Sequence, residues 1–189
     1  MHADTSTHAA LEPSRWIARF ASLVAPGARV LDVASGHGRH ARFFAARGCR
    51  VVAVDRDAAA LASLAAVPGV QARTLDLESG VWPPAGERFD AIVVTNYLHR
   101  PLFLPLLAAL APDGAFLYET FAAGNEAFGR PANPDFLLLP GELLTIAQTR
   151  LTVIAFEQGQ VVDGARAAVV QRLAAVGLAR AWPSSLGDS

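Results

Sequence analysis

The chain has no lysine, and its 16 strongly basic residues are all arginine. A mechanism that needs a lysine base or a lysine Schiff base is therefore excluded. A single cysteine, Cys49, excludes an internal disulfide and is typical of a reducing compartment. An excess of charge of either sign is also lacking, since 16 basic and 17 acidic residues leave a net charge of −1. This balance gives no general attraction to nucleic acid or to an anionic membrane.

Long apolar runs are missing as well. The longest, residues 102–111, is interrupted by Pro105 and falls far short of the about 20 residues that a membrane span needs. The first residues show no basic stretch followed by an apolar one, so no signal peptide is predicted. We therefore expect a cytoplasmic protein that does not bind membranes. With 52% hydrophobic residues, the chain is expected to form one domain with a full core over residues 1–189.

The sequence does contain a buried strand followed by a glycine turn and a helix start, at residues 30–47. Three of the first four residues are aliphatic, which suits a strand of a parallel sheet. Gly36 and Gly38 follow, and glycine is needed where the backbone takes positive φ or a ligand approaches closely. The N–H groups that begin a helix favour an anionic or electron-rich ligand. We interpret the stretch as the nucleotide-facing turn of an α/β domain, with a plain structural turn as the alternative.

A carboxylate strengthens this interpretation. Asp55 ends a second buried strand, residues 51–55, about 20 residues beyond the glycines, where a carboxylate can accept hydrogen bonds from both hydroxyls of a ribose. The alternative role is that of a helix N-cap. Asp57 can cap the helix expected over residues 58–66, which leaves Asp55 free for a ligand.

These residues resemble the first motif of the class I S-adenosylmethionine-dependent methyltransferases, an acid followed by glycines at alternate positions. The matching run is DVASGHG at residues 32–38, with Ala34 where the first glycine is usual. We take this alanine to mean that position 34 lies outside the left-handed region. The resemblance extends in order and spacing over residues 30–121. Within the family, the chain is most similar to the small bacterial enzymes of the tellurite-resistance and thiopurine types.

The resemblance implies S-adenosylmethionine as the cofactor. Asp76 matches the acid that bonds the adenine amino group, and Leu77 would offer the ring a backbone N–H and an apolar face. The alternative for Asp76 is a loop residue that caps a turn. His37 is a candidate cofactor contact, and His40 is expected on the helix surface. The predicted cofactor-binding residues are Asp32, Ala34, Gly36, Gly38, Asp55, Arg56, Asp76, Leu77 and Asn96.

The expected fold is α/β: a Rossmann-like, seven-stranded, mostly parallel sheet with strand seven antiparallel and helices on both faces. Strands are predicted over residues 29–33, 50–55, 70–75, 89–94, 115–120, 151–157 and 166–173. Glycines 159 and 164 mark the turn between the last two strands, which must then be antiparallel. Residues 1–12 are expected to be disordered. Residues 121–140, rich in glycine and proline, are expected to form a lid or acceptor-binding loop.

The methyl acceptor is expected beyond the carboxyl ends of the strands, where open parallel sheets bind ligands. A sulfonium methyl group is already activated, so positioning and the exclusion of water supply most of the acceleration. The candidate catalytic residues are His99, Tyr97 and Glu119, and a surface histidine is the alternative for His99, the preferred base. Arg100 and Arg130 would hold an acidic acceptor unless they are plain surface charges. The predicted substrate-binding residues are Tyr97, Arg100, Tyr118 and Arg130.

A nicotinamide-dependent oxidoreductase is the main alternative function, because the glycine turn fits the dinucleotide fingerprint and Asp55 suits NAD. Asp32, Asp76 and the expected terminal hairpin favour the methyltransferase. A non-catalytic protein that binds S-adenosylmethionine is a third interpretation. A metal site is not expected, since His37 and His40 have no carboxylate or cysteine at ligand spacing. The sequence lacks a basic stripe and the Asn-Pro-Pro-Tyr pattern of base-methylating relatives, so a small-molecule acceptor is favoured over nucleic acid.

Overall fold

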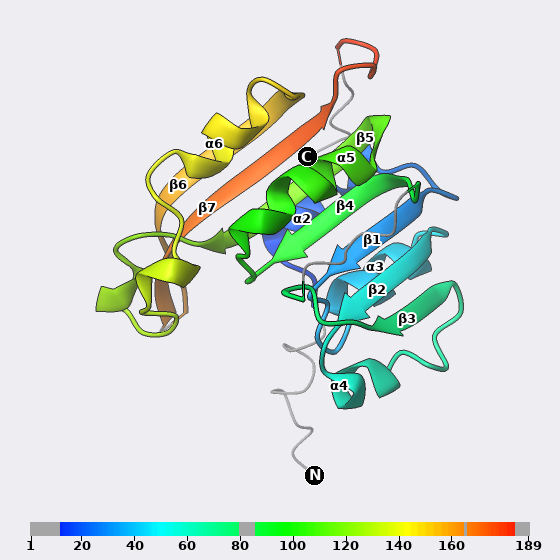
Figure 1. The fold of residues 1–189 in the computed structure, drawn as a ribbon, viewed down its shortest axis with the longest axis horizontal. Coiled ribbons are helices and arrows are strands. Elements are labelled where there is room, and N and C mark those ends of the chain that lie inside the picture. Colours follow the sequence, from blue (N-terminus) through cyan, green and yellow to red (C-terminus); the bar gives the residue numbers. More distant parts are fainter. Residues whose placement is uncertain (1–11, 80–85, 165, 184–189) are drawn as a thin grey trace.

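A computed structural model describes residues 12–79, 86–164 and 166–183, and residues 1–11 of the segment expected to be disordered lie outside it. Seven strands form one sheet in the order β3-β2-β1-β4-β5-β7-β6 (Figure 1). The strands are β1 (Arg29–Val33), β2 (Arg50–Asp55), β3 (Val70–Thr74), β4 (Phe89–Thr95), β5 (Leu110–Phe121), β6 (Leu151–Asp163) and β7 (Arg166–Gly177). The first five are parallel, and β7 pairs antiparallel with both β5 and β6. The predicted fold class, including its reversed seventh strand, is confirmed.

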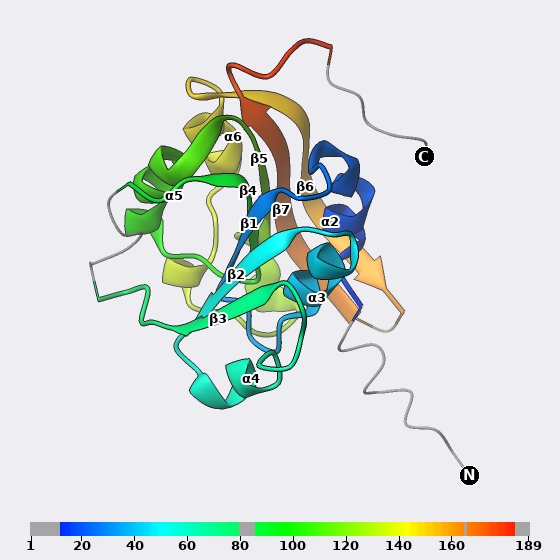
Figure 2. The ribbon, with the colours of Figure 1, turned by 90° about the vertical axis from the view of Figure 1, so that its right-hand side faces the viewer.

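Helices cover both faces of the sheet (Figures 1 and 2). Side chains of α2 (Arg15–Arg19), α3 (Arg39–Ala46) and α4 (Ala58–Ala62) pack on one face, and those of α5 (Phe103–Ala109) and α6 (Glu142–Ala147) pack on the other. Each face carries its own hydrophobic core. Successive residues of a strand point to opposite faces, so Val30 packs in the core with α2, α3 and α4, and Leu31 packs in the core with α5 and α6. Short 3₁₀ helices are η1 (Ala21–Leu23), η2 (Arg100–Leu102), η3 (Asn125–Ala127) and η4 (Pro134–Phe136).

The terminal hairpin is longer than predicted. Its ladder runs from Leu151 opposite Gly177 to Asp163 opposite Arg166, so β6 and β7 have 13 and 12 residues. Gly159, predicted to mark the turn, lies inside β6 opposite Val170. A glycine within a strand gives the same sequence signal as one in a turn, which explains the error. In the part of the chain that the structure describes, no helix has the length and apolar character needed to cross a membrane.

Candidate cofactor and acceptor site

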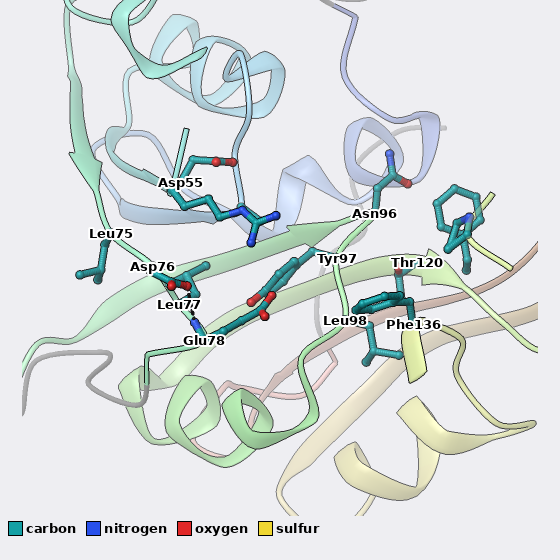
Figure 3. A pocket seen from close by; sticks show the side chains of 14 residues that line it. Asp55, Leu75, Asp76, Leu77, Glu78, Asn96, Tyr97, Leu98, Thr120 and Phe136 are labelled. Atoms are coloured by element: carbon teal, nitrogen blue, oxygen red, sulfur yellow. Dashed lines mark hydrogen bonds between the residues drawn. The ribbon is translucent and has the colours of Figure 1, made fainter. Parts of the chain in front are cut away.

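A cavity of about 410 Å³ opens at the carboxyl ends of the parallel strands (Figure 3). Figure 3 shows Asp55, Asp76 and Glu78 on one side of it and Thr120 and Phe136 on the other. A second hollow of about 230 Å³ lies over the glycine turn and shares Ala34 and Asn96 with the first. The two hollows therefore adjoin along the end of β1, and the volume of the first lies within the size range of ligand sites.

Asp55 ends β2 and lines the cavity. One carboxylate oxygen accepts a hydrogen bond from the Gly36 N–H at 2.8 Å, and the other accepts one from the Asp57 N–H at 2.9 Å. Asp57 caps α4, as predicted, by accepting hydrogen bonds from the N–H groups of Ala59 and Ala60. Each carboxylate oxygen has further acceptor capacity, so Asp55 can hold the turn and a ligand together.

Asp76 lies just after β3 and lines the same cavity as Asp55. Its carboxylate accepts a hydrogen bond from the Glu78 N–H at 3.0 Å, so it also caps a turn. The two roles that the sequence left open are therefore compatible. Leu77 is buried and contributes an apolar surface to the cavity. Adjacent strands thus place two carboxylates beside one apolar surface.

Ala34 has a φ of 52° and lies in the left-handed region, so the expectation for this position was wrong. Asn96, at the end of β4, has a φ of 55°. The left-handed conformation costs a residue with a Cβ atom about 1–2 kcal/mol. Both strained residues line both hollows, and strain of this kind gathers at functional sites.

Replacing Ala34 by glycine is therefore expected to stabilise the protein by about 0.5–1 kcal/mol, because relief of the strain exceeds the added entropy of the unfolded chain. The measurement is the free energy of unfolding in urea. Ala59→Gly, within α4, is the control and should destabilise by about 1 kcal/mol. A loss of stability in both variants would contradict the interpretation.

Two residues predicted to bind the cofactor support the turn without lining either hollow. Asp32 is 1% exposed, and its carboxylate accepts a hydrogen bond from the Ala41 N–H at 2.9 Å. Burial raises the pKa of Asp32 to about 7. Gly38 has a φ of 73°, and a Cβ atom there would lie 2.5 Å from the methyl carbons of Leu64. Asp32 and Gly38 therefore set the shape of the turn beneath the site.

His40 was expected on the helix surface but is only 2% exposed. Its Nε2 accepts a hydrogen bond from the Ser14 N–H at 3.1 Å, and its Nδ1 lies 3.4 Å from the Thr95 hydroxyl. Burial lowers the pKa of His40 to about 3, so the ring is neutral. His40 and the exposed His37 both line the second hollow. His37, the candidate cofactor contact, thus lies at the hollow over the glycine turn.

Of the candidate acceptor residues, Tyr97 lines the cavity. Its buried hydroxyl has no hydrogen-bond partner among the residues that the structure describes, and burial raises its pKa to about 12. Tyr118 lies outside the lining and donates a hydrogen bond to the Tyr97 carbonyl at 2.8 Å. Burial raises the pKa of the Tyr118 hydroxyl strongly. Tyr118 therefore supports the backbone behind Tyr97.

The preferred base, His99, and a second candidate catalytic residue, Glu119, are not brought to the cavity. His99 precedes η2, where its carbonyl accepts a hydrogen bond from the Leu102 N–H, and it is not a lining residue. Glu119 forms an ion pair with Arg172 at 2.9 Å and accepts a hydrogen bond from the Ser14 hydroxyl at 3.0 Å. This carboxylate is held toward β7 and α2, which is why it does not reach the cavity.

The two arginines predicted to hold an acidic acceptor also lie outside the lining. Arg100 is paired with Glu142, and Arg130 is exposed on the 121–140 segment. Other residues line the cavity: Phe121, Pro131 and Phe136 from the 121–140 segment that was expected to form a lid or acceptor-binding loop, and Leu75, Glu78, Leu98 and Thr120, which were not among the predicted site residues. The rule that ligands bind at strand carboxyl ends could have found Thr120 at the end of β5.

Residues 6–142, more than half of the chain, match the model of a protein family described as "Methyltransferase domain". The chain belongs to this family, and the protein is an enzyme of the methyltransferase class. The resemblance to the class I S-adenosylmethionine-dependent methyltransferases is confirmed. A comparison with curated protein sequences finds no match.

Solved structures show the same fold. TehB from Haemophilus influenzae is similar at a TM-score of 0.70 and 16% identity, covering 92% of this chain; the chain spans 63% of TehB. A TehB-like SAM-dependent methyltransferase from Corynebacterium glutamicum has a TM-score of 0.63 and 20% identity, with 90% and 92% of the two chains covered. An S-adenosylmethionine-dependent methyltransferase from Mesorhizobium loti has a TM-score of 0.67 and 19% identity, covering 87% and 98%.

Proposed function

We propose that the enzyme transfers a methyl group from S-adenosylmethionine to a small-molecule acceptor. One observation carries the choice of donor: Asp55 and Asp76, at the ends of neighbouring strands, line the same cavity beside the glycine turn. In that arrangement Asp55 would accept hydrogen bonds from the ribose hydroxyls, and Asp76 would accept one from the adenine amino group. Leu77 supplies the apolar face that a purine needs.

The hydrogen-bonding groups of the site fit such a nucleoside. The buried hydroxyls of Ser35 and Tyr97 have no hydrogen-bond partner within the described residues, and each residue lines one of the two hollows. Buried polar groups without partners are costly, so a polar ligand at these positions would satisfy them. Arg39, which lines the second hollow, supplies a cation there for the carboxylate of the amino-acid end.

Bound S-adenosylmethionine would supply a methyl group on a positively charged sulfur. A lone pair of the acceptor forms the new bond to the methyl carbon, and the electron pair of the sulfur–methyl bond stays on the sulfur. The chain's part is to hold both reactants in line and to exclude water. The neutral Tyr97 hydroxyl cannot act as a base near pH 7, since its pKa is about 12. Because His99 and Glu119 do not line the cavity, positioning is the main contribution that we assign to the protein.

Binding of S-adenosylhomocysteine, measured by titration calorimetry, tests the proposal directly. We expect micromolar affinity, because charged hydrogen bonds and buried apolar area both contribute. NADH, titrated under the same conditions, is expected not to bind. Binding of NADH without binding of S-adenosylhomocysteine would favour the nicotinamide-dependent alternative and refute the proposal.

A further inference from the structure

The cavity has a charged side and an apolar side. Its charged lining residues lie at or just after the ends of β2 and β3: Asp55, Arg56, Asp76 and Glu78. The lining residues that follow β4, and those from β5 and the 121–140 segment, carry no charge. We name four of these the apolar wall: Leu98, Phe121, Pro131 and Phe136. In Figure 3 the Tyr97 ring stands between Glu78 on the charged side and Leu98 and Phe136 of the wall.

Arg100 holds the part of the wall that carries Phe136. Its Nη1 and Nη2 donate hydrogen bonds to the carbonyls of Asp135 and Leu137, at 2.9 and 2.8 Å. Its Nε and Nη2 donate to the two carboxylate oxygens of Glu142, at 2.8 and 2.9 Å. The two carbonyls belong to the residues directly before and after Phe136. One guanidinium therefore connects both of these residues to Glu142 at the start of α6. Four of the five N–H donors of Arg100 are thereby used.

Asn125 holds Pro131 of the wall in a similar way. It is buried, its amide donates a hydrogen bond to the Pro131 carbonyl at 3.0 Å, and its carbonyl oxygen accepts one from the Val169 N–H at 3.1 Å. Both loop residues of the wall are therefore fixed by side-chain contacts to the rest of the fold. A surface held in this way can select a ligand by shape.

An anionic acceptor would meet a poor environment at the apolar wall. Arg100 is committed to Glu142 and two carbonyls, and moving a charge against apolar side chains without a partner is costly. We propose that the acceptor is an uncharged molecule with a flat apolar face that packs on the apolar wall, and that Arg100 is the positioning residue of this wall. This inference rests on the proposed function, since it assigns the acceptor side of the same cavity.

Three rings of one size and different charge test the proposal: benzamide, benzoate and benzamidine. Their affinities for the wild-type protein saturated with S-adenosylhomocysteine are measured by NMR titration. We expect benzamide to bind at least ten-fold more tightly than either ion. Benzoate binding as tightly as benzamide, or no binding of any ring, would overturn the proposal. If S-adenosylhomocysteine itself does not bind, the proposed function fails, and the same ring series without it still tests the wall.

Variants separate the positioning role of Arg100 from a direct contact. Arg100→Gln and Arg100→Lys should both weaken benzamide at least five-fold and leave the affinity for S-adenosylhomocysteine unchanged, because lysine lacks the planar fork. Retention of benzamide affinity in both would refute the positioning role. A larger loss of affinity for benzoate than for benzamide in Arg100→Gln would instead identify an anion contact and overturn it too.

Phe136→Ala tests the wall without removing the Arg100 contacts, and it keeps the test valid if the arginine variants fail to fold. Phe136 is 50% exposed, so its replacement is expected to be tolerated. Benzamide should bind at least five-fold more weakly to this variant. Phe128→Ala is the matched control, since Phe128 is 44% exposed on the same segment and outside the cavity lining. Equal effects of the two substitutions would contradict the proposal.

Discussion

Asp55→Ala is expected to weaken the binding of S-adenosylhomocysteine by at least 100-fold. The carboxylate lines the cavity and holds the Gly36 and Asp57 N–H groups. A hydrogen bond to a charged group contributes about 1.5–3 kcal/mol, so two such bonds to a ribose give about 3 kcal/mol or more. Each factor of ten in affinity corresponds to about 1.4 kcal/mol. Titration calorimetry of the variant beside the wild type measures the loss.

Two further variants make this result specific. Asp55→Asn keeps an oxygen acceptor but loses the charge, so its affinity should lie between those of the wild type and Asp55→Ala. Asp113→Ala removes an exposed carboxylate near the start of β5, away from the strand carboxyl ends, and should bind like the wild type. Equal affinities of the wild type and Asp55→Ala would show that Asp55 does not hold the ribose.

The second large effect concerns the pH dependence of stability. His40 has a folded pKa of about 3 against an ordinary value of 6.5, so below pH 6.5 the unfolded chain takes up a proton that the native ring does not. The contribution of neutral His40 to the free energy of unfolding is therefore complete above pH 6.5 and is lost as the pH falls toward 3. Asp32 has a folded pKa of about 7 against 3.8, so its contribution is complete below pH 3.8 and is lost as the pH rises toward 7.

Between about pH 4 and 6.5 these two buried groups oppose each other. Each changes the free energy of unfolding by about 1.4 kcal/mol per pH unit, with opposite sign. Relative to the wild type, Asp32→Asn should gain stability with rising pH at about that slope, and His40→Gln should lose it at the same slope. The double variant should run parallel to the wild type. Urea unfolding across this range measures the slopes, and single variants parallel to the wild type would contradict the assignment.

The sheet and the charged side of the cavity were predictable because their signals are local. Buried parallel strands are runs of aliphatic residues, and Asp55 ends such a run in β2. Asp76 lies two residues after β3, a partly exposed strand at the edge of the sheet. The position of a carboxylate at a strand end then follows from the topology alone. This is why the predicted residues Asp55, Arg56, Asp76, Leu77 and Asn96 all line one cavity.

The 121–140 segment was expected to form a lid or acceptor-binding loop, but which of its residues line the cavity was not predictable because distant contacts hold them in place. Arg100 and Phe136 are brought together by hydrogen bonds to backbone groups 35 and 37 positions along the chain, which leave no periodicity in the sequence. His40 was misplaced for the same reason, since its partner Ser14 is 26 residues away. Ala34 was misjudged for a different reason. The left-handed conformation is unfavourable for alanine by itself, and the sequence alone did not show that the turn requires it at this position.

The contacts of Ser14 have a practical consequence for studying the enzyme. Its N–H is bound to His40 beside the second hollow, and its hydroxyl reaches Glu119 near the end of β5. The chain before Ser14 therefore joins the fold beside the second hollow, where we propose that the amino-acid end of the methyl donor binds, so an amino-terminal tag would be attached on that side. β7 runs antiparallel to β5 and therefore ends beside the amino-terminal part of β5, away from the strand carboxyl ends. A tag placed after β7 would leave both hollows clear for titration.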